Sequence, residues 1–262
     1  MIRKAILLAA GRGERMGSLT DHQPKPLIPI SGKPLMQYGI ELLASHGVDH
    51  IGVNVSYHAE KIKTYFGGGS RFGLKLEYVD EHELTGTAGG MRKVAAAMAL
   101  SEPFFVLSAD MLVNFDLRAV AEAHRVSEGI ATLCCYFRPR DQLKKSGVIL
   151  FDESTKKILR FVERPQTDSE IVSQWVSSSV YAFSPEILSF VSPKDEGSPV
   201  VDLPRDVFPK VLASSKKIFA FPVDGAKFYQ LGIDTPDRIA RAEQDIASGR
   251  FRTVTGRETE GH

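Results

Sequence analysis

The sequence has few cysteines, and its charges nearly cancel. Its 262 residues include two cysteines, Cys134 and Cys135, which are adjacent within an apolar stretch. Adjacent residues of a strand point to opposite faces, so this pair predicts neither a disulfide nor a cysteine-based metal site. We therefore expect both to be core residues of a protein in a reducing compartment, the cytoplasm.

Charge and hydropathy exclude two further classes of protein. The 33 basic and 32 acidic residues give a formal net charge of +1, whereas a nucleic-acid-binding surface usually leaves a basic excess. No apolar stretch approaches the ~18 residues that a membrane-spanning helix needs. The seven histidines also lack the HExxH spacing typical of zinc enzymes. The composition predicts a globular protein that binds neither nucleic acid nor a membrane.

Strand and helix patterns alternate through the first half of the chain. Short apolar runs predict strands at 5–10, 51–55, 74–79 and 104–107, and helical patterns lie between them at 34–46, 59–65 and 88–100. After residue 130, four closely spaced strands (130–137, 148–151, 157–162, 176–183) precede a helix (203–212), two short strands (218–222, 228–231) and a last helix (236–248). We predict a Rossmann-like three-layer α/β/α fold with a mostly parallel central sheet and a smaller mixed β sub-sheet.

A glycine-rich turn follows the first predicted strand. Gly11 and Gly13 match two of the three glycines of a dinucleotide-binding fingerprint, but Met16 stands where the third is required. A P-loop needs Ser or Thr after its Gly-Lys pair, and here Lys33 is followed by Pro34. The sequence therefore contains neither of these two common nucleotide motifs.

Cations cluster on the same turn. A tight connection would explain the glycines, but it would not explain why Arg12, Arg15 and Lys25 share one loop. Backbone N–H groups freed by glycine bind anions, and neighbouring cations suit a polyphosphate. The loop favours phosphate binding over a purely structural role.

The loop also resembles that of a known family. The run LAAGRGERM at 8–16, then Leu19-Thr20 and Pro24-Lys25-Pro26-Leu27, is similar to the signature of sugar-1-phosphate nucleotidylyltransferases. These enzymes make a nucleotide sugar and pyrophosphate from a nucleoside triphosphate and a sugar 1-phosphate. The resemblance implies that Ala10, Gly11 and Gly13 bind the nucleotide and that Arg15 and Lys25 are catalytic.

Two later segments continue the resemblance on the nucleotide side. Residues 81–89 are similar to the family's E-x-x-x-L-G-T-A-G segment, which implies that Glu81, Gly86 and Thr87 bind the nucleotide base. The Glu81 carboxylate could accept from guanine N1–H and N2–H₂, or equally from N3–H of uracil or thymine. Asp110 ends a Ser-Ala-Asp run in place of the family's N-G-D, which implies a catalytic aspartate that binds Mg²⁺.

Three further segments correspond to the family's sugar side. Gly147 lies in a counterpart of the Y/F-G-V element, and Glu163-Arg164 replaces the Glu-Lys of V-E-K-P. The resemblance implies that Glu163 accepts sugar hydroxyls and that Arg164 holds the sugar phosphate, a role that the bidentate guanidinium can fill. Ser179 replaces the glycine of N-A-G-I-Y, which narrows the sugar pocket.

The second metal ligand has two candidate positions. A strict overlay on the family's D-I-G-T-P element places Gln230 at the ligand, whereas the D-T-P-E-D form of related cytidylyltransferases places Asp234 there. We predict that Asp234, with Asp110, binds Mg²⁺, although Asp234 could instead cap the helix that begins near Pro236.

The resemblance extends along nearly the whole chain. It implies one nucleotidyltransferase domain at 1–250, with a nucleotide-binding half of about 1–128 and a sugar-binding half of about 129–250, before a polar tail at 251–262. We expect a Mg²⁺-dependent homo-oligomeric enzyme whose partners are a sugar 1-phosphate and GTP, UTP or dTTP. Three alternatives stay open: a cytidylyl- or guanylyltransferase for a phosphonate or cyclitol phosphate, a glycosyltransferase, and a silent homologue that senses nucleotide sugars.

Overall fold

Four parallel strands form the first half of the central sheet. The computed structural model describes residues 1–192 and 200–252. The strands are β1 (Lys4–Leu8), β4 (His50–Val55), β5 (Lys75–Asp80) and β6 (Phe104–Ser108), in the order β6-β1-β4-β5. All four were predicted, because each is a short apolar run bounded by turn residues. Their parallel pairing confirms the predicted α/β class.

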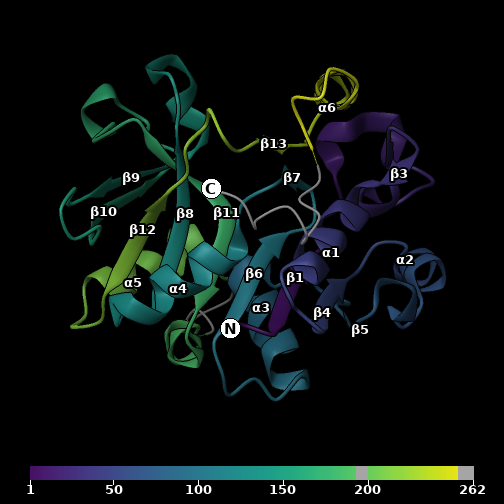
Figure 1. The fold of residues 1–262 in the computed structure, drawn as a ribbon, viewed down its shortest axis with the longest axis horizontal. Coiled ribbons are helices and arrows are strands. Elements are labelled where there is room, and N and C mark those ends of the chain that lie inside the picture. The colour runs from purple at the N-terminus through teal and green to yellow at the C-terminus, as the bar shows by residue number, and fades with distance from the viewer. Residues whose placement is uncertain (193–199, 253–262) are drawn as a thin grey trace, which may run out of the picture.

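The second half continues the same sheet with mixed strands. These are β8 (Ala131–Phe137), β9 (Gly147–Phe151), β10 (Ile158–Glu163), β11 (Trp175–Phe183) and β12 (Ile218–Pro222). The long strand β11 pairs antiparallel with β6, β8 and β9, so it joins the two halves into a nine-stranded sheet. Figure 1 shows the later strands fanned out beside the earlier ones. The predicted sub-sheet is thus an extension of the central sheet through β11.

Helices pack against both faces of this sheet. The α-helices are α1 (Leu35–Ser45), α2 (Ala59–Phe66), α3 (Gly86–Ala97), α4 (Leu117–Ser127), α5 (Phe208–Leu212) and α6 (Pro236–Ala247). α5 directly follows a π-helical turn, Leu203–Val207. α4 was not predicted, although Asp116 caps it by accepting a hydrogen bond from the Arg118 amide. Within residues 1–192 and 200–252, no helix is long and apolar enough to cross a membrane.

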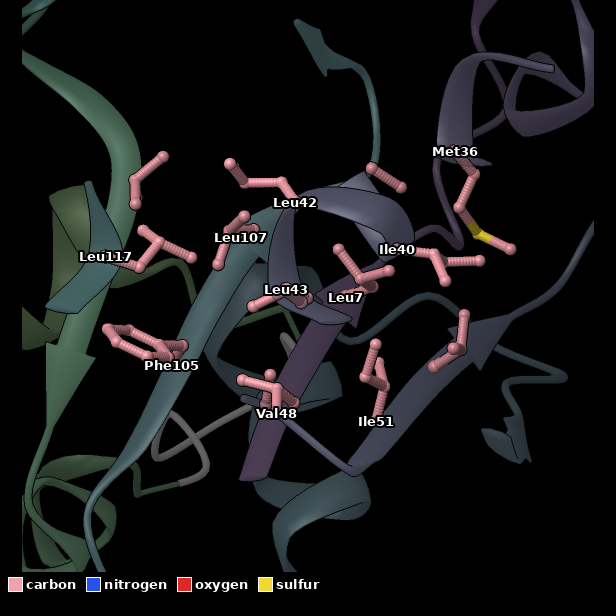
Figure 2. Close-up of a cluster of buried hydrophobic side chains, with 14 of the residues drawn as sticks. Leu7, Met36, Ile40, Leu42, Leu43, Val48, Ile51, Phe105, Leu107 and Leu117 are labelled. Carbon is pink, nitrogen blue, oxygen red and sulfur yellow. The ribbon is translucent and has the colours of Figure 1, made fainter. Parts of the chain in front are cut away.

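The alternation of side chains along the strands divides the core into two layers. On β1, Leu7 faces a cluster that includes side chains of α1, α2 and α4, and Ile6 faces a cluster that includes α3 and α5. Figure 2 shows the first cluster, in which Ile40, Leu42 and Leu43 of α1 lie beside Leu7, Phe105 and Leu107. The helix–sheet–helix arrangement confirms the predicted three layers.

The two cysteines lie in opposite layers of the core. Cys134 belongs to the first cluster and Cys135 to the second, and both are fully buried free thiols. Burial raises the pKa of each thiol above its usual value. They are core residues, as the sequence predicted.

The C-terminal segment packs against the N-terminal loop. α6 and two short ladders, β2 (Pro29–Ile30) with β3 (Lys33–Pro34) and β7 (Met111–Val113) with β13 (Gln230–Gly232), surround a third apolar cluster. Phe251 contacts Tyr38 and Tyr229 edge-on, with ring centroids 5.7 and 5.2 Å apart. Phe251, at the start of the expected polar tail, is therefore buried, and residues 253–262 of that tail lie outside the described residues.

His124 makes the stability of the fold depend on pH. The side chain projects from α4, is 4% exposed, and lies 3.0 Å from Thr132 Oγ1 and 3.1 Å from Ser184 Oγ. Burial lowers its pKa to about 4, whereas an unfolded chain binds the proton near pH 6.5.

We predict that the free energy of unfolding decreases as pH is lowered from about 6.5 to about 4, because the unfolded state gains the proton first. The contribution of this group has a slope of at most about 1.4 kcal/mol per pH unit. Denaturant titrations of His124→Asn between these pH values should show a shallower decline than wild type. The matched control is His22→Asn at an exposed histidine, and an equal slope in all three proteins would contradict the prediction.

Candidate functional site

A pocket of about 570 Å³ opens at the carboxyl ends of the parallel strands. In open α/β sheets this edge is where ligands bind. Ten of the residues predicted to bind nucleotide, catalyse or hold metal line the pocket together: Ala10, Gly11, Gly13, Arg15, Lys25, Glu81, Gly86, Thr87, Asp110 and Asp234. Asn54 and Asp202 line it too, and neither was predicted from the sequence.

The glycine loop is shaped by one left-handed residue and one buried anchor. Gly13 has φ 70° and precedes a 3₁₀ segment, Glu14–Thr20. A Cβ at Gly13 would lie 3.1 Å from side-chain carbons of both Lys25 and Thr20, so glycine lets the loop close onto Lys25. Met16 is 1% exposed and packs in the third apolar cluster. A hydrophobic anchor therefore stands where a dinucleotide-binding loop would have its third glycine.

Two ion pairs cross the pocket. Nζ of Lys25 lies 2.5 Å from Oδ2 of Asp110, and Nη1 of Arg15 lies 2.6 Å from Oδ2 of Asp234. The Lys25 side chain is 10% exposed, whereas that of Arg15 is 70% exposed. The charge of the buried Lys25 is therefore less screened by solvent than that of the exposed Arg15.

A short ladder brings the two aspartates together. In the β7–β13 pairing, Gly232 lies opposite Met111, and the amide of Ile233 donates to the carbonyl of Asp110 at 2.8 Å. Asp234 follows directly and lines the same pocket as Asp110. Figure 1 shows β13 bridging from the later strands towards α6, with β7 beside it. The pairing thus joins chain segments that are more than a hundred residues apart.

The register also separates the two candidates for the second metal position. Gln230 pairs with Val113, farther along the ladder, and lines a different cavity of about 290 Å³. Its Oε1 is buried and accepts no hydrogen bond from the described residues. Asp234, and not Gln230, therefore shares the pocket with Asp110.

The two carboxylates suit a magnesium ion that also binds phosphate. Oδ1 of Asp234 is buried, accepts no hydrogen bond from the described part of the chain, and lies 3.3 Å from Nε of Arg238. Mg²⁺ commonly takes one or two carboxylates from a protein and its other ligands from water and phosphate. Residues 1–192 and 200–252 contain no metal-sized group of three or more His, Cys, Asp or Glu. These residues fit an open site with two protein ligands.

The turn at the start of α3 is closed by a segment from the second half. Gly86 has φ 78°, and a Cβ there would lie 2.5 Å from the carbonyl oxygen of Val201. Oδ1 of Asp202 accepts from the amide and the hydroxyl of Thr87 at 3.1 and 3.3 Å. No sequence signal predicts this contact, because Thr87 and Asp202 are 115 residues apart.

Polar contacts also fix Glu81 and Asn54. The Glu81 side chain is 1% exposed and bonds to Asn54, Thr85 and Lys93. Asn54 could have been found from the sequence, since it is a polar residue inside the apolar strand β4. A buried asparagine side chain needs hydrogen-bond partners, and Asn54 bonds to Ala9 and Glu81 in the pocket wall.

The four residues predicted for the sugar side lie on β9, at the end of β10, and on β11, and none is among the described residues that line the 570 Å³ pocket. Gly147 pairs with Glu163, and a Cβ at Gly147 would lie 2.8 Å from Glu163 Oε2. Nε of Arg164 lies 3.4 Å from Glu163 Oε1. Burial raises the pKa of Glu163. The positive charge of Arg164 lowers this pKa, and the negative charge of Asp202 raises it. Glu163 therefore lies near the pocket wall that Asp202 forms.

Ser179 interrupts strand β11. Its φ of 59° lies in the left-handed region, and the pairing of β11 with β8 shifts register between Ser177 and Tyr181. Ser177 Oγ and Tyr181 Oη lie 3.1 Å apart beside this bulge. The sequence predicted a narrower pocket at Ser179, and the structure adds an unusual backbone conformation for a residue with a side chain.

The open α/β sheet carries a glycine loop at its strand ends, together with two cations that pair with two carboxylates. This architecture is typical of proteins that bind phosphate and nucleotides. The family model for nucleotidyl transferases matches residues 4–248. The chain belongs to this family, as the resemblance implied.

Several curated relatives share much of the sequence. A UTP–glucose-1-phosphate uridylyltransferase from Synechocystis is 36% identical over 231 residues, covering 84% of this chain and 58% of that protein. A mannose-1-phosphate guanylyltransferase from Mycobacterium tuberculosis is 29% identical, with 94% and 65% covered. The catalytic subunit beta of the Dictyostelium discoideum mannose-1-phosphate guanylyltransferase is 29% identical, with 85% and 59% covered. The chain spans less than two thirds of each of these relatives.

Solved structures share the fold at lower identity. A UDP-glucose pyrophosphorylase complexed with UDP-glucose has a TM-score of 0.80 and 20% identity, with 95% of this chain and all of the other covered. HddC from Yersinia pseudotuberculosis, complexed with GMP-PN, has a TM-score of 0.72 and 22% identity, with 94% of this chain covered. The whole described fold, with both halves of its sheet, therefore has known counterparts.

The geometry predicts which side chains bind a divalent cation. Asp110→Asn and Asp234→Asn should each weaken binding at least about 10-fold, because each removes a carboxylate ligand. Gln230→Ala should bind as wild type does, since Gln230 lines another cavity. Binding can be measured by titrating Mn²⁺ as a paramagnetic probe. Weakened binding in Gln230→Ala together with unchanged binding in Asp234→Asn would reverse the assignment.

Proposed function

We propose that this chain transfers a nucleotidyl group from a nucleoside triphosphate to a sugar 1-phosphate and releases pyrophosphate. The observation that carries this proposal is the meeting of Arg15, Lys25, Asp110 and Asp234 in one pocket at the carboxyl edge of the sheet. The names of the curated relatives, a uridylyltransferase and guanylyltransferases that act on sugar 1-phosphates, support it.

The chemistry requires positioning and charge neutralisation more than acid–base catalysis. The second pKa of a phosphate monoester is about 6, so a sugar 1-phosphate is largely dianionic at pH 7 and already nucleophilic. An oxygen of the sugar phosphate attacks the α-phosphorus, and a new P–O bond forms. The bond between the α-phosphorus and the oxygen that bridges it to the β-phosphate breaks. Pyrophosphate leaves with that electron pair. Four of the charged side chains that line the pocket, Arg15, Lys25, Asp110 and Asp234, suit this reaction.

The glycine loop and its cations would hold the triphosphate. Backbone N–H groups at Gly11 and Gly13, with the exposed Arg15, would bind the β- and γ-phosphates. Lys25 would offset charge at the α-phosphate, where its near-complete burial strengthens the interaction. Phosphate binding would replace the two ion pairs of the pocket with cation–phosphate pairs, and it would leave both carboxylates free to bind a metal.

Asp110 and Asp234 would hold Mg²⁺, which supplies Lewis-acid polarisation and neutralises phosphate charge when bound. The sugar phosphate would approach from the side of β9 and β10. There Arg164 would bind the phosphate, and Glu163 would accept hydroxyl groups. Gly147 leaves room for the Glu163 carboxylate, and Ser179 would limit the space beside it.

The reaction can be tested by a substrate screen. GTP, UTP, dTTP, CTP and ATP would be incubated with Mg²⁺ and a panel of hexose, amino-sugar, heptose and cyclitol phosphates, and pyrophosphate release would be measured. We expect turnover with a sugar 1-phosphate and GTP, UTP or dTTP. Turnover only with CTP and a cyclitol phosphate would support the first alternative, and no release with any pair would fit a silent homologue or a glycosyltransferase.

The cations of the loop should act on the chemical step. Arg15→Ala and Lys25→Ala should each lower kcat by roughly 10² or more, because each removes a charge that stabilises the transition state. Lys33→Ala is the matched control, since Lys33 pairs with Glu41 at 2.6 Å outside this pocket. Because Lys25 is buried, thermal melting of Lys25→Met would show whether the loss is catalytic. Near-normal turnover in Arg15→Ala or Lys25→Met would contradict the assignment.

A further inference from the structure

A short segment from the second half of the chain closes over the start of α3. The amides of Ala88 and Gly89 donate to the carbonyl of Val201 at 2.9 and 3.2 Å. Oδ1 of Asp202 accepts from the amide of Thr87 at 3.1 Å. The first four amides of a helix have no partner within the helix. In α3, three of these four are therefore bonded to residues 201 and 202.

The side chain of Thr87 strengthens the same contact. Its hydroxyl donates to Oδ1 of Asp202 at 3.3 Å and accepts from the amide of Leu203 at 2.8 Å. Gly86 permits this close approach, since a Cβ there would lie 2.5 Å from the carbonyl oxygen of Val201. Both the backbone and the side chain of the Gly86–Thr87 turn are thus held by a segment more than a hundred residues away.

Asp202 is also held from its own side. Nη2 of Arg205 lies 3.1 Å from Oδ2 of Asp202 and 3.0 Å from Oδ2 of Asp206. The amide of Asp202 donates to Oδ2 of Asp206 at 2.7 Å, and the amide of Asp206 donates to the carbonyl of Asp202 at 2.9 Å. One carboxylate oxygen of Asp202 therefore bonds to Thr87, and the other pairs with Arg205. Such a connected polar network fixes the arrangement of its members.

The same segment packs against the predicted sugar side. It continues through the π-helical turn into α5, which begins at Phe208. The ring centroid of Phe208 lies 5.2 Å from that of Phe161 and 5.5 Å from that of Tyr181. Phe161 comes two residues before Glu163 on β10, and Tyr181 comes two residues after Ser179 on β11. One segment therefore supports both the start of α3 and the strands that carry the predicted sugar residues.

We infer that Asp202 is a positioning residue that sets the distance between the nucleotide at the Gly86–Thr87 turn and the sugar phosphate at the ends of β9 and β10. This inference rests on the proposed function, because it concerns the two substrates of that reaction. Each substrate has binding groups of its own, whereas Asp202 connects the two halves that carry them. A displacement of about 1 Å between reacting groups can lower a rate about 10²-fold. The contact therefore acts on the chemical step.

The test separates substrate binding from catalysis in variants of Asp202. The Kd of the preferred nucleoside triphosphate would be measured by calorimetry without a sugar phosphate, and kcat and KM for the sugar 1-phosphate by pyrophosphate release. Asp202→Ala removes the side-chain bonds to Thr87 and the pair with Arg205. We expect kcat to fall roughly 10-fold or more, while Kd and KM stay within about 3-fold of wild type. Asp202→Asn retains an oxygen that can accept from Thr87, and it should recover most of the lost kcat.

Asp116→Ala is the matched control. Asp116 caps α4 by a bond of the same kind, to the amide of Arg118 at 3.0 Å, and it is not among the described residues that line the 570 Å³ pocket. This variant should lower the melting temperature and leave kcat and KM unchanged. Hydrogen exchange of the amides at 87–89 supplies a readout that does not depend on turnover. Exchange should be faster than wild type in Asp202→Ala and unchanged in Asp116→Ala.

The outcomes separate this inference from the proposed function. Unchanged kcat in Asp202→Ala, or an equal loss of kcat in Asp116→Ala, would overturn the inference and leave the proposed reaction intact. A KM for the sugar 1-phosphate that rises 10-fold or more at unchanged kcat would mean that Asp202 binds the sugar directly, and it would overturn the inference as well. Wild-type protein that releases no pyrophosphate with any pair of substrates would refute the proposed function, and the inference with it.

Discussion

The parallel register of β1, β4 and β6 is the constraint on which the pocket depends. Because the three strands end at the same edge, the loops that leave them must share one space. Backbone bonds hold these ends together, since the amide of Ala109 donates to the carbonyl of Leu8 at 3.0 Å and the amide of Glu81 donates to that of Val55 at 2.7 Å. Asn54 adds a side-chain bond to Ala9 at the same level. These bonds fix where the glycine loop, Asp110 and the Thr85–Thr87 turn begin. Asp234 is then added by the pairing of β13 with β7.

Placing a cation and a carboxylate together near the buried floor of the pocket has an electrostatic cost that their pairing offsets. Removing the Lys25 ammonium from water without a counter-charge would be unfavourable, and the carboxylate of Asp110 at 2.5 Å supplies that charge. The Arg15–Asp234 pair lies closer to solvent and is weaker for that reason. The same four groups can re-pair with phosphate and a divalent cation, since that exchange leaves no charge unpartnered. A stable resting site and a reactive one can therefore use the same side chains.

Local patterns in the sequence predicted most of the first half, because buried parallel strands and the glycine loop carry their signals within a few residues. The helix α4 was not predicted, although Asp116 caps it. Motif resemblance located the ten pocket residues, and it offered two overlays for the second metal position, of which the one that gives Asp234 was preferred to the one that gives Gln230. That choice depends on the register of β13 against β7, which is a pairing across more than a hundred residues. Asp202 was missed for the same reason. A residue whose role depends on partners far away in the sequence has no local sequence pattern that would predict it.

The predicted sugar side differs from the 570 Å³ pocket in which residues carry a left-handed backbone. Among the described residues that line the 570 Å³ pocket, those with a left-handed backbone are Gly13 and Gly86, and glycine adopts this conformation at little cost. On the sugar side, Arg164 and Ser179 adopt φ of 51° and 59°, a region in which a side chain costs of the order of 1 kcal/mol. Such strain persists only where the surrounding structure holds it, and here the backbone bond from the amide of Arg164 to the carbonyl of Ser146 and the bulge of β11 do so. At these two positions the sequence also departs from the family pattern. The family's glycine adopts the backbone conformation of Ser179 freely. The side chain of Ser179 therefore adds volume without a change in backbone conformation. The strained backbone therefore coincides with two of the predicted sugar-side positions, Arg164 and Ser179, at which the sequence departs from the family pattern.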